Sequence, residues 1–164
     1  DPELKNILFA LGMLVLCAGL GLLASQIGNV TMSSVSEDKT SEVGGLQGTF
    51  QNFGASLGTA LIGSVMIANL TAGFITNINQ NSDIPDEVKT SINDKAQGGV
   101  PIVSSPEVEN YALSAGLSTV EADAITSSYE NSQLKSLKFA MFFVVILDLA
   151  AIALSRNIPD KKLA

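Results

Sequence analysis

This sequence has no histidine, no tryptophan, one cysteine and few charged residues among its 164 positions. Without histidine, and with Cys17 as the single thiol, neither the usual nucleophile–base pairs nor the common zinc ligand sets can be assembled. We therefore expect no enzyme activity, no catalytic residue, no metal site and no cofactor. A single cysteine also cannot form a disulfide within the chain.

The sequence also lacks a basic region. Lysine and arginine total 9 against 16 aspartate and glutamate residues, for a net charge of −7. Nucleic-acid-binding proteins present a clustered basic face, so we expect no nucleic acid partner. Charged residues are only 15% of the chain, against about 25% in a typical soluble domain. This low content argues against an ordinary soluble domain.

Three long runs of residues carry almost no charge. Residues 6–36 and 43–82 contain no charged side chain, and residues 139–155 contain only Asp148. A helix needs about 20 predominantly apolar residues to cross the hydrocarbon core of a bilayer. The sequence thus predicts an all-α, multi-pass protein of the cell membrane, in contact with the lipid bilayer. Its three transmembrane helices are expected at 6–35, 43–70 and 136–156.

The segments between these spans differ in length and charge. Residues 36–42 form a short charged turn, whereas residues 71–135 carry nine acidic and three basic residues, a net charge of −6. Arg156 and the lysines of the tail 157–164 place that tail in the cytoplasm by the positive-inside rule. With three spans, the turn is then cytoplasmic, and 71–135 is an acidic extracytoplasmic loop with short helices.

The acidic loop contains clear signals for helix starts and for one break. Glycines and a proline at 97–101 interrupt regular structure. Ser105 followed by Pro106 predicts a capping serine before a proline at the first helical position. Ser118 and Glu121 have the spacing of a capping box. The helix that starts there can run into the last span, because no proline or glycine intervenes.

The middle span is rich in glycine. In a soluble helix each glycine costs about 1 kcal/mol relative to alanine, but in a membrane glycines let helix backbones approach closely. The four-residue spacing of Gly44 with Gly48 and of Gly54 with Gly58 fits either a mobile helix pair in a transporter or static packing in any polytopic protein. The candidate helix-packing glycines are Gly44, Gly48, Gly54, Gly58 and Gly63.

Amide side chains near the cytoplasmic ends of the first two spans form a second candidate group. Amides at membrane depth need hydrogen-bond partners and often line a cavity. They could contact a substrate, or could bond only to one another and to the turn. These candidate cavity residues are Gln47, Gln51, Asn52, Gln26 and Asn29.

Asp148 is the one charged residue clearly within a predicted span. A carboxylate inside a membrane is energetically costly, and proton transfer is the first function to consider for it. The alternative is a carboxylate near the inner interface that is satisfied by water or by Arg156, two helical turns further on. Asp148 is therefore a candidate proton-linked residue with a structural alternative.

Two stretches resemble a known family. GLGLLASQIGNV at 19–30 is followed by a short charged turn and by EVGGLQGTFQNFGASLGTALIGSV at 42–65. Together they resemble the carboxy-terminal part of major facilitator superfamily transporters, most closely the fourteen-helix drug:proton antiporter branch. The resemblance is strong over residues 11–65 and rests on layout alone elsewhere: a long outer loop and one last helix.

The resemblance implies a fragment of a multidrug efflux antiporter whose three spans are the last three helices. Its partners would be the remaining helices, a small amphipathic substrate and protons, with export by alternating access. Gly54, Gly58 and Gly63 resemble a carboxy-half counterpart of the family's antiporter motif, whereas Asp148 matches no family proton site. Two alternatives remain: a small stand-alone membrane subunit, and a membrane-anchored binding module with an acidic outer loop.

Overall fold

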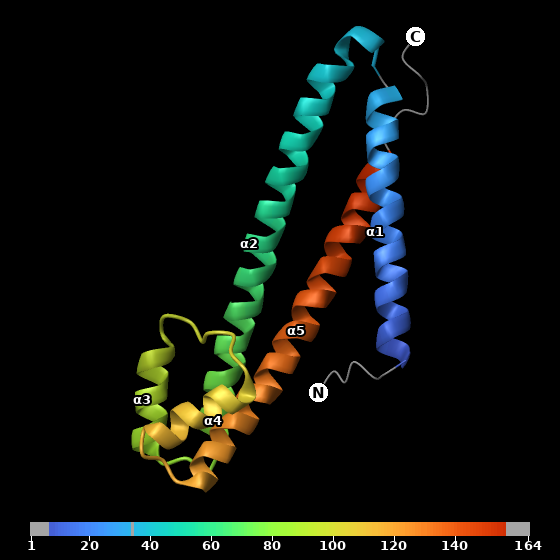
Figure 1. The fold of residues 1–164 in the computed structure, drawn as a ribbon. Coiled ribbons are helices and arrows are strands. Elements are labelled where there is room, and N and C mark those ends of the chain that lie inside the picture. Colours follow the sequence, from blue (N-terminus) through green and yellow to red (C-terminus); the bar gives the residue numbers. More distant parts are fainter. Residues whose placement is uncertain (1–6, 34, 157–164) are drawn as a thin grey trace. The chain divides into compact units, whose positions relative to one another are not determined.

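The computed structural model describes residues 7–33 and 35–156. Within these ranges all regular structure is helical and there is no strand, so the all-α prediction is confirmed for the described residues. The helices, shown in Figure 1, are α1 (Ile7–Ser33), a short 3-10 helix (Glu37–Lys39), α2 (Thr40–Gln80), α3 (Asp86–Ala96), α4 (Ser105–Ser114) and α5 (Thr119–Ser155).

Three stretches are long and apolar enough to cross a membrane: α1, Glu37–Gln80 and α5. α1 has 27 residues and α5 has 37. At about 1.5 Å per residue each exceeds the roughly 30 Å of a hydrocarbon core. The number of candidate spans therefore agrees with the sequence, and their composition is compatible with a multi-pass membrane protein.

The helices are longer than the predicted spans. α2 continues to Gln80, ten residues beyond the predicted end at Leu70, because Phe74 and Ile78 extend the apolar spacing of Leu70 by one turn each. α5 begins at Thr119 rather than near residue 136. The predicted loop 71–135 is therefore largely helical, and both of its ends belong to long helices.

The described part of the chain divides into two compact units, which meet between Ser56 and Leu57. The first unit holds α1 and the start of α2, and α1 has no buried residue. The predicted tail 157–164 lies outside the described residues, as do Asn6 at the predicted start of the first span and Ser34 within it.

The second unit contains the hydrophobic core. One side of this core comes from α2, with Leu70, Phe74 and Ile78 at four-residue steps. Residues between the two long helices and the first turns of α5 complete it: Ile84, Ala96, Val100, Ala112, Ala122, Ile125 and Tyr129. We call residues 70–136, which surround this core, the cap.

The predicted helix starts are confirmed with one shift. The Ser118 side chain accepts a hydrogen bond from the Glu121 backbone N–H at 3.3 Å, and the Glu121 carboxylate accepts from the Ser118 N–H at 2.7 Å. This capping box starts the helix that runs unbroken to Ser155. α4, however, has Ser104 as its N-cap and includes Ser105. The prediction of Ser105 as the cap was wrong by one residue.

Candidate functional site

The candidate helix-packing glycines all lie on α2, but their surroundings differ. At Gly44 an added Cβ would lie 3.0 Å from the Met32 Cε, so the end of α1 approaches α2 closely beside the 36–42 turn. At the other four, Gly48, Gly54, Gly58 and Gly63, an added Cβ would meet no described atom of its own unit within 4 Å, apart from its chain neighbours and the nearby helix backbone. These four glycines leave open surface on α2.

The candidate cavity amides are not brought together. Gln26 and Asn29 are exposed on α1, and Gln51 and Asn52 are exposed on α2. No hydrogen bond in the described part of the chain joins any two of the five. Gln47 is half-buried, and its Oε1 has no hydrogen-bond partner among the described residues. Its Nε2 is 4.0 Å from the position of an added Cβ at Gly28.

Asp148 lies on α5 with its side chain exposed. Arg156 is the C-cap residue of α5, two turns further on. Within the described residues the only ion pair is Lys89 with Asp86 at 3.4 Å, so Asp148 and Arg156 do not pair there. The proton-linked role of Asp148 stays a prediction.

The structure does bring together polar residues of the cap that the sequence analysis did not single out. Gly73 on α2 faces Ser132 on α5, and a Cβ added at Gly73 would lie 3.5 Å from the Ser132 Cβ. One turn along α2, the Asn77 Nδ2 donates to the Ser132 Oγ at 2.8 Å and to the Ser128 carbonyl at 3.4 Å. Small side chains on both helices make this close, hydrogen-bonded contact geometrically feasible.

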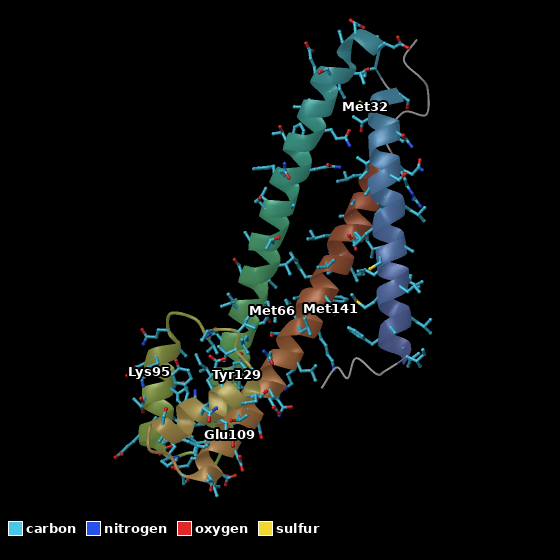
Figure 2. All side chains as sticks on the ribbon, viewed as in Figure 1. Met32, Met66, Lys95, Glu109, Tyr129 and Met141 are labelled. Carbon is cyan, nitrogen blue, oxygen red and sulfur yellow. The ribbon has the colours of Figure 1, made fainter. Side chains whose placement is uncertain are left out.

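Tyr129, labelled in Figure 2, belongs to α5 and is part of the buried core of the cap. Its side chain is 1% exposed, and its ring packs edge-on against Phe74 with centroids 5.9 Å apart. The Tyr129 hydroxyl accepts from the Val103 N–H at 2.8 Å and lies 3.0 Å from the Pro101 carbonyl oxygen, to which it can donate. A buried aromatic residue of α5 thereby fixes the linker between α3 and α4.

The same linker is bonded to α2. The Thr71 Oγ1 accepts from the Val100 N–H at 2.9 Å. On the α5 side, the Gln133 Nε2 donates to the Val103 carbonyl at 3.3 Å. We call Thr71, Gly73, Asn77, Tyr129 and Ser132 the junction, because they connect α2, α5 and the linker within the second unit.

A sequence signal for the junction was present. Ser128, Ser132, Ser136 and Ala140 follow one another at four-residue steps on α5, and all four are buried. This is the small-residue spacing that identified the packing face of α2. It was overlooked because residues 71–135 were expected to form an acidic loop with short helices, and packing of the helix that starts at Ser118 against the end of α2 was not considered.

The acidic residues of the cap lie at its surface. Eight of the nine are exposed, and the ninth, Glu121, is half-buried in the capping box. Within the described residues no group of three or more histidine, cysteine, aspartate or glutamate side chains is arranged to hold a metal ion.

The chain was compared with known proteins. No family model matches it, and no curated protein and no solved structure matches it at a significant level.

Proposed function

We propose that this chain is the carboxy-terminal part of a secondary active transporter that exports small amphipathic compounds in exchange for protons. In this proposal α1, α2 and α5 are three helices of a larger bundle, and transport proceeds by alternating access. The resemblance of residues 19–30 and 42–65 to the fourteen-helix drug:proton antiporters supports the family, and the three candidate spans are compatible with it.

The open glycine face of α2 is the observation that carries the proposal. Glycine in a helix interior is unfavourable by about 1 kcal/mol relative to alanine, and four such residues on one helix need a compensating contact. Gly48, Gly54, Gly58 and Gly63 have no such contact within the described part of their own units. Close approach of another membrane helix would supply it, as in a transporter bundle.

The test is efflux by the complete protein whose end this chain would form. Inverted membrane vesicles would be energised with an inside-acid proton gradient, a fluorescent amphipathic cation would be added to the medium, and export would be followed as its uptake into the vesicle lumen with and without an uncoupler. We expect uncoupler-sensitive export. Gly58→Leu should abolish most of it, because the added side chain would block a partner helix. Gly98→Leu, at an open position in the cap, is the matched control and should transport normally.

Asp148 is tested in the same assay. If it carries a coupled proton, Asp148→Asn loses uncoupler-sensitive export, whereas Asp123→Asn, at an exposed acid of the cap, keeps it. Unchanged export by Asp148→Asn would remove Asp148 from the mechanism and leave the transporter proposal intact. Wild-type vesicles that export none of several amphipathic cations would contradict the proposal itself.

One observation favours a second candidate, a membrane-anchored binding module. The cap has its own core and exposes eight acidic residues, so it could present an acidic surface to a cationic partner. The efflux assay separates the two candidates, because a module that only binds would export nothing. Replacing exposed cap acids such as Glu107 and Glu109 with glutamine would weaken binding of a cationic partner while leaving any export by a transporter measurable.

A further inference from the structure

We infer that the junction joins α2 and α5 into one rigid body, so that these two helices do not separate at the cap when the protein changes conformation. This inference rests on the proposed function, because it specifies which helix contact stays closed during transport. It concerns only the second unit, in which the cap parts of both helices lie.

The first argument is the direct contact between the helices. Gly73 and Ser132 pack too closely for a water molecule to lie between them. A Cβ added at Gly73 would be 3.5 Å from the Ser132 Cβ, which is already van der Waals contact. Ser132 and Ser136 are each 1% exposed. Separating the helices here would expose the hydrogen-bonded Asn77 and Ser132 pair and break a packed small-residue face.

The second argument is that one linker is bonded to both helices. Val100 donates to Thr71 of α2, and three residues later Val103 donates to Tyr129 of α5. Movement of α2 away from α5 would break at least one of these bonds. Each lost bond would leave a partly buried backbone N–H without a partner, which is costly.

The third argument is where the packing ends. The buried residues of α5 stop at Ala140, and in the rest of the helix to Arg156 every residue is exposed except the half-buried Phe143. Helix contacts that form and break during a transport cycle can be made on this exposed surface of α5. The junction cannot form new contacts in this way, because its side chains already have packed or hydrogen-bonded neighbours.

A disulfide across the junction tests the inference. Gly73→Cys with Ser132→Cys, in a Cys17→Ser background of the complete protein, places two Cβ atoms at 3.5 Å, and disulfides span about 3.5–4.5 Å. Oxidation in membranes should consume both thiols, measured by loss of maleimide labelling. Transport should stay within about twofold of the reduced protein, because rigid-body motion preserves distances within the body.

The control pair is Ala72→Cys with Asn131→Cys, one residue away on the same helices and exposed on both. It should keep its thiols under the same oxidation. Loss of transport on oxidation of the Gly73 and Ser132 pair, restored by reductant, would overturn the inference. Transport absent from the wild type would contradict the proposed function, whereas crosslinking would still report on the junction.

A second measurement covers the case in which the cysteine pair at Gly73 and Ser132 does not fold. Spin labels at the exposed Ala72 and Asn131 positions would report the distance between α2 and α5 by pulsed electron paramagnetic resonance. With and without a proton gradient and substrate, the inference expects one unchanged distance distribution. A second distance that grows with either condition would show that the junction opens and would reject the inference.

Discussion

α1 and the cap are both helical, but only the cap has an interior. α1 has 27 residues and buries none of them, although every side chain from Ile7 to Ala24 is apolar. α5 buries seven of 37, and all seven lie between Ala122 and Ala140. The comparison shows that apolar composition and packing are separate properties, because the most apolar helix is the least buried.

The pattern of side chains explains the difference. Apolar residues surround α1 on every side, and a helix of this kind is stable only inside a large core or in lipid. In the cap, the buried residues of each long helix recur at four-residue steps on one face: Leu70, Phe74 and Ile78 on α2, and Ser128, Ser132 and Ser136 on α5. α1 can therefore be buried only by lipid or by other helices, whereas the residues of the cap bury one another.

Among the substitutions that test the difference between α1 and the cap, removal of the Tyr129 side chain should destabilise the cap most. Tyr129→Ala removes a 1% exposed ring, its contact with Phe74 and the hydroxyl that binds Val103. Truncation of a buried aromatic residue costs about 3–5 kcal/mol. We expect the cap to unfold at much lower urea in detergent micelles, with hydrogen exchange accelerated in α3 and α4 and unchanged in α1.

Tyr111→Ala is the matched control, because Tyr111 is 72% exposed on α4. Surface substitutions of this kind change stability by about 0.5 kcal/mol or less. Equal destabilisation by the two substitutions would mean that the cap has no specific interior, and the distinction from α1 would fail.

Introducing bulk at the helix contact should have the second largest effect. Gly73→Leu forces side-chain atoms into the space held by Ser132, since even an added Cβ is already in van der Waals contact. Overpacking costs about 1–3 kcal/mol. The urea midpoint of the cap should fall accordingly, and the exchange of Ser132 and its neighbours should rise.

Gly58→Leu on the same helix is the control for this effect. No described atom lies within 4 Å of a Cβ at Gly58. The cap should keep its stability, even though this substitution is expected to block efflux by the complete protein. If both leucine variants destabilised the cap to the same extent, the distinction between the closed contact and the open glycine face would be wrong.

A smaller effect is expected in the linker between α3 and α4. Gly99 has a φ of +95°, and a Cβ there would lie 3.3 Å from the Ile67 Cγ2. Gly99→Ala should destabilise the cap by roughly 1–2 kcal/mol, the cost of a left-handed conformation for an L-residue. Gly98 lacks a positive φ and has open space, so Gly98→Ala should be neutral or slightly stabilising. Thermal unfolding of the two variants compares them directly.

Much of the fold could be predicted from local signals. Uncharged runs located the three long helices, the Ser118 and Glu121 spacing started α5, and the glycines at 98 and 99 separated α3 from α4. Each of these signals acts within a few residues along the chain. Local physics was therefore sufficient to find α1, α2, α4 and α5, whereas no start had been predicted for α3.

The cap core and the junction could not be predicted in the same way. The hydrogen bond from Asn77 to Ser132 joins residues 55 positions apart, and that from Val103 to Tyr129 joins residues 26 apart. Such contacts depend on which helix faces meet, which composition does not specify. High polarity and acidity in 71–135 favoured a loop, whereas a few apolar residues at four-residue steps were enough to build a core.

The smallest of the expected effects concerns the start of α5. Ser118→Ala removes the Oγ that accepts from the Glu121 N–H, and N-cap serine to alanine changes cost about 1 kcal/mol. Only the cap should lose stability, because the first turns of α5 place Ala122, Ile125 and Tyr129 in its core. Hydrogen exchange should therefore increase near Glu121 and in α4 but not beyond Ala140.

Ser127→Ala, at an exposed site two turns further along α5, separates capping from helix propensity. Alanine is the better helix former by a few tenths of a kcal/mol, so this variant should be neutral or more stable. Ser118→Thr keeps a hydroxyl cap and should recover most of the loss. If Ser118→Ala instead loosened α5 along its whole length, the cap and the apolar half of α5 would unfold as one unit. The apolar half would then share the stability of the cap, and the contrast with α1 would extend to all of α5.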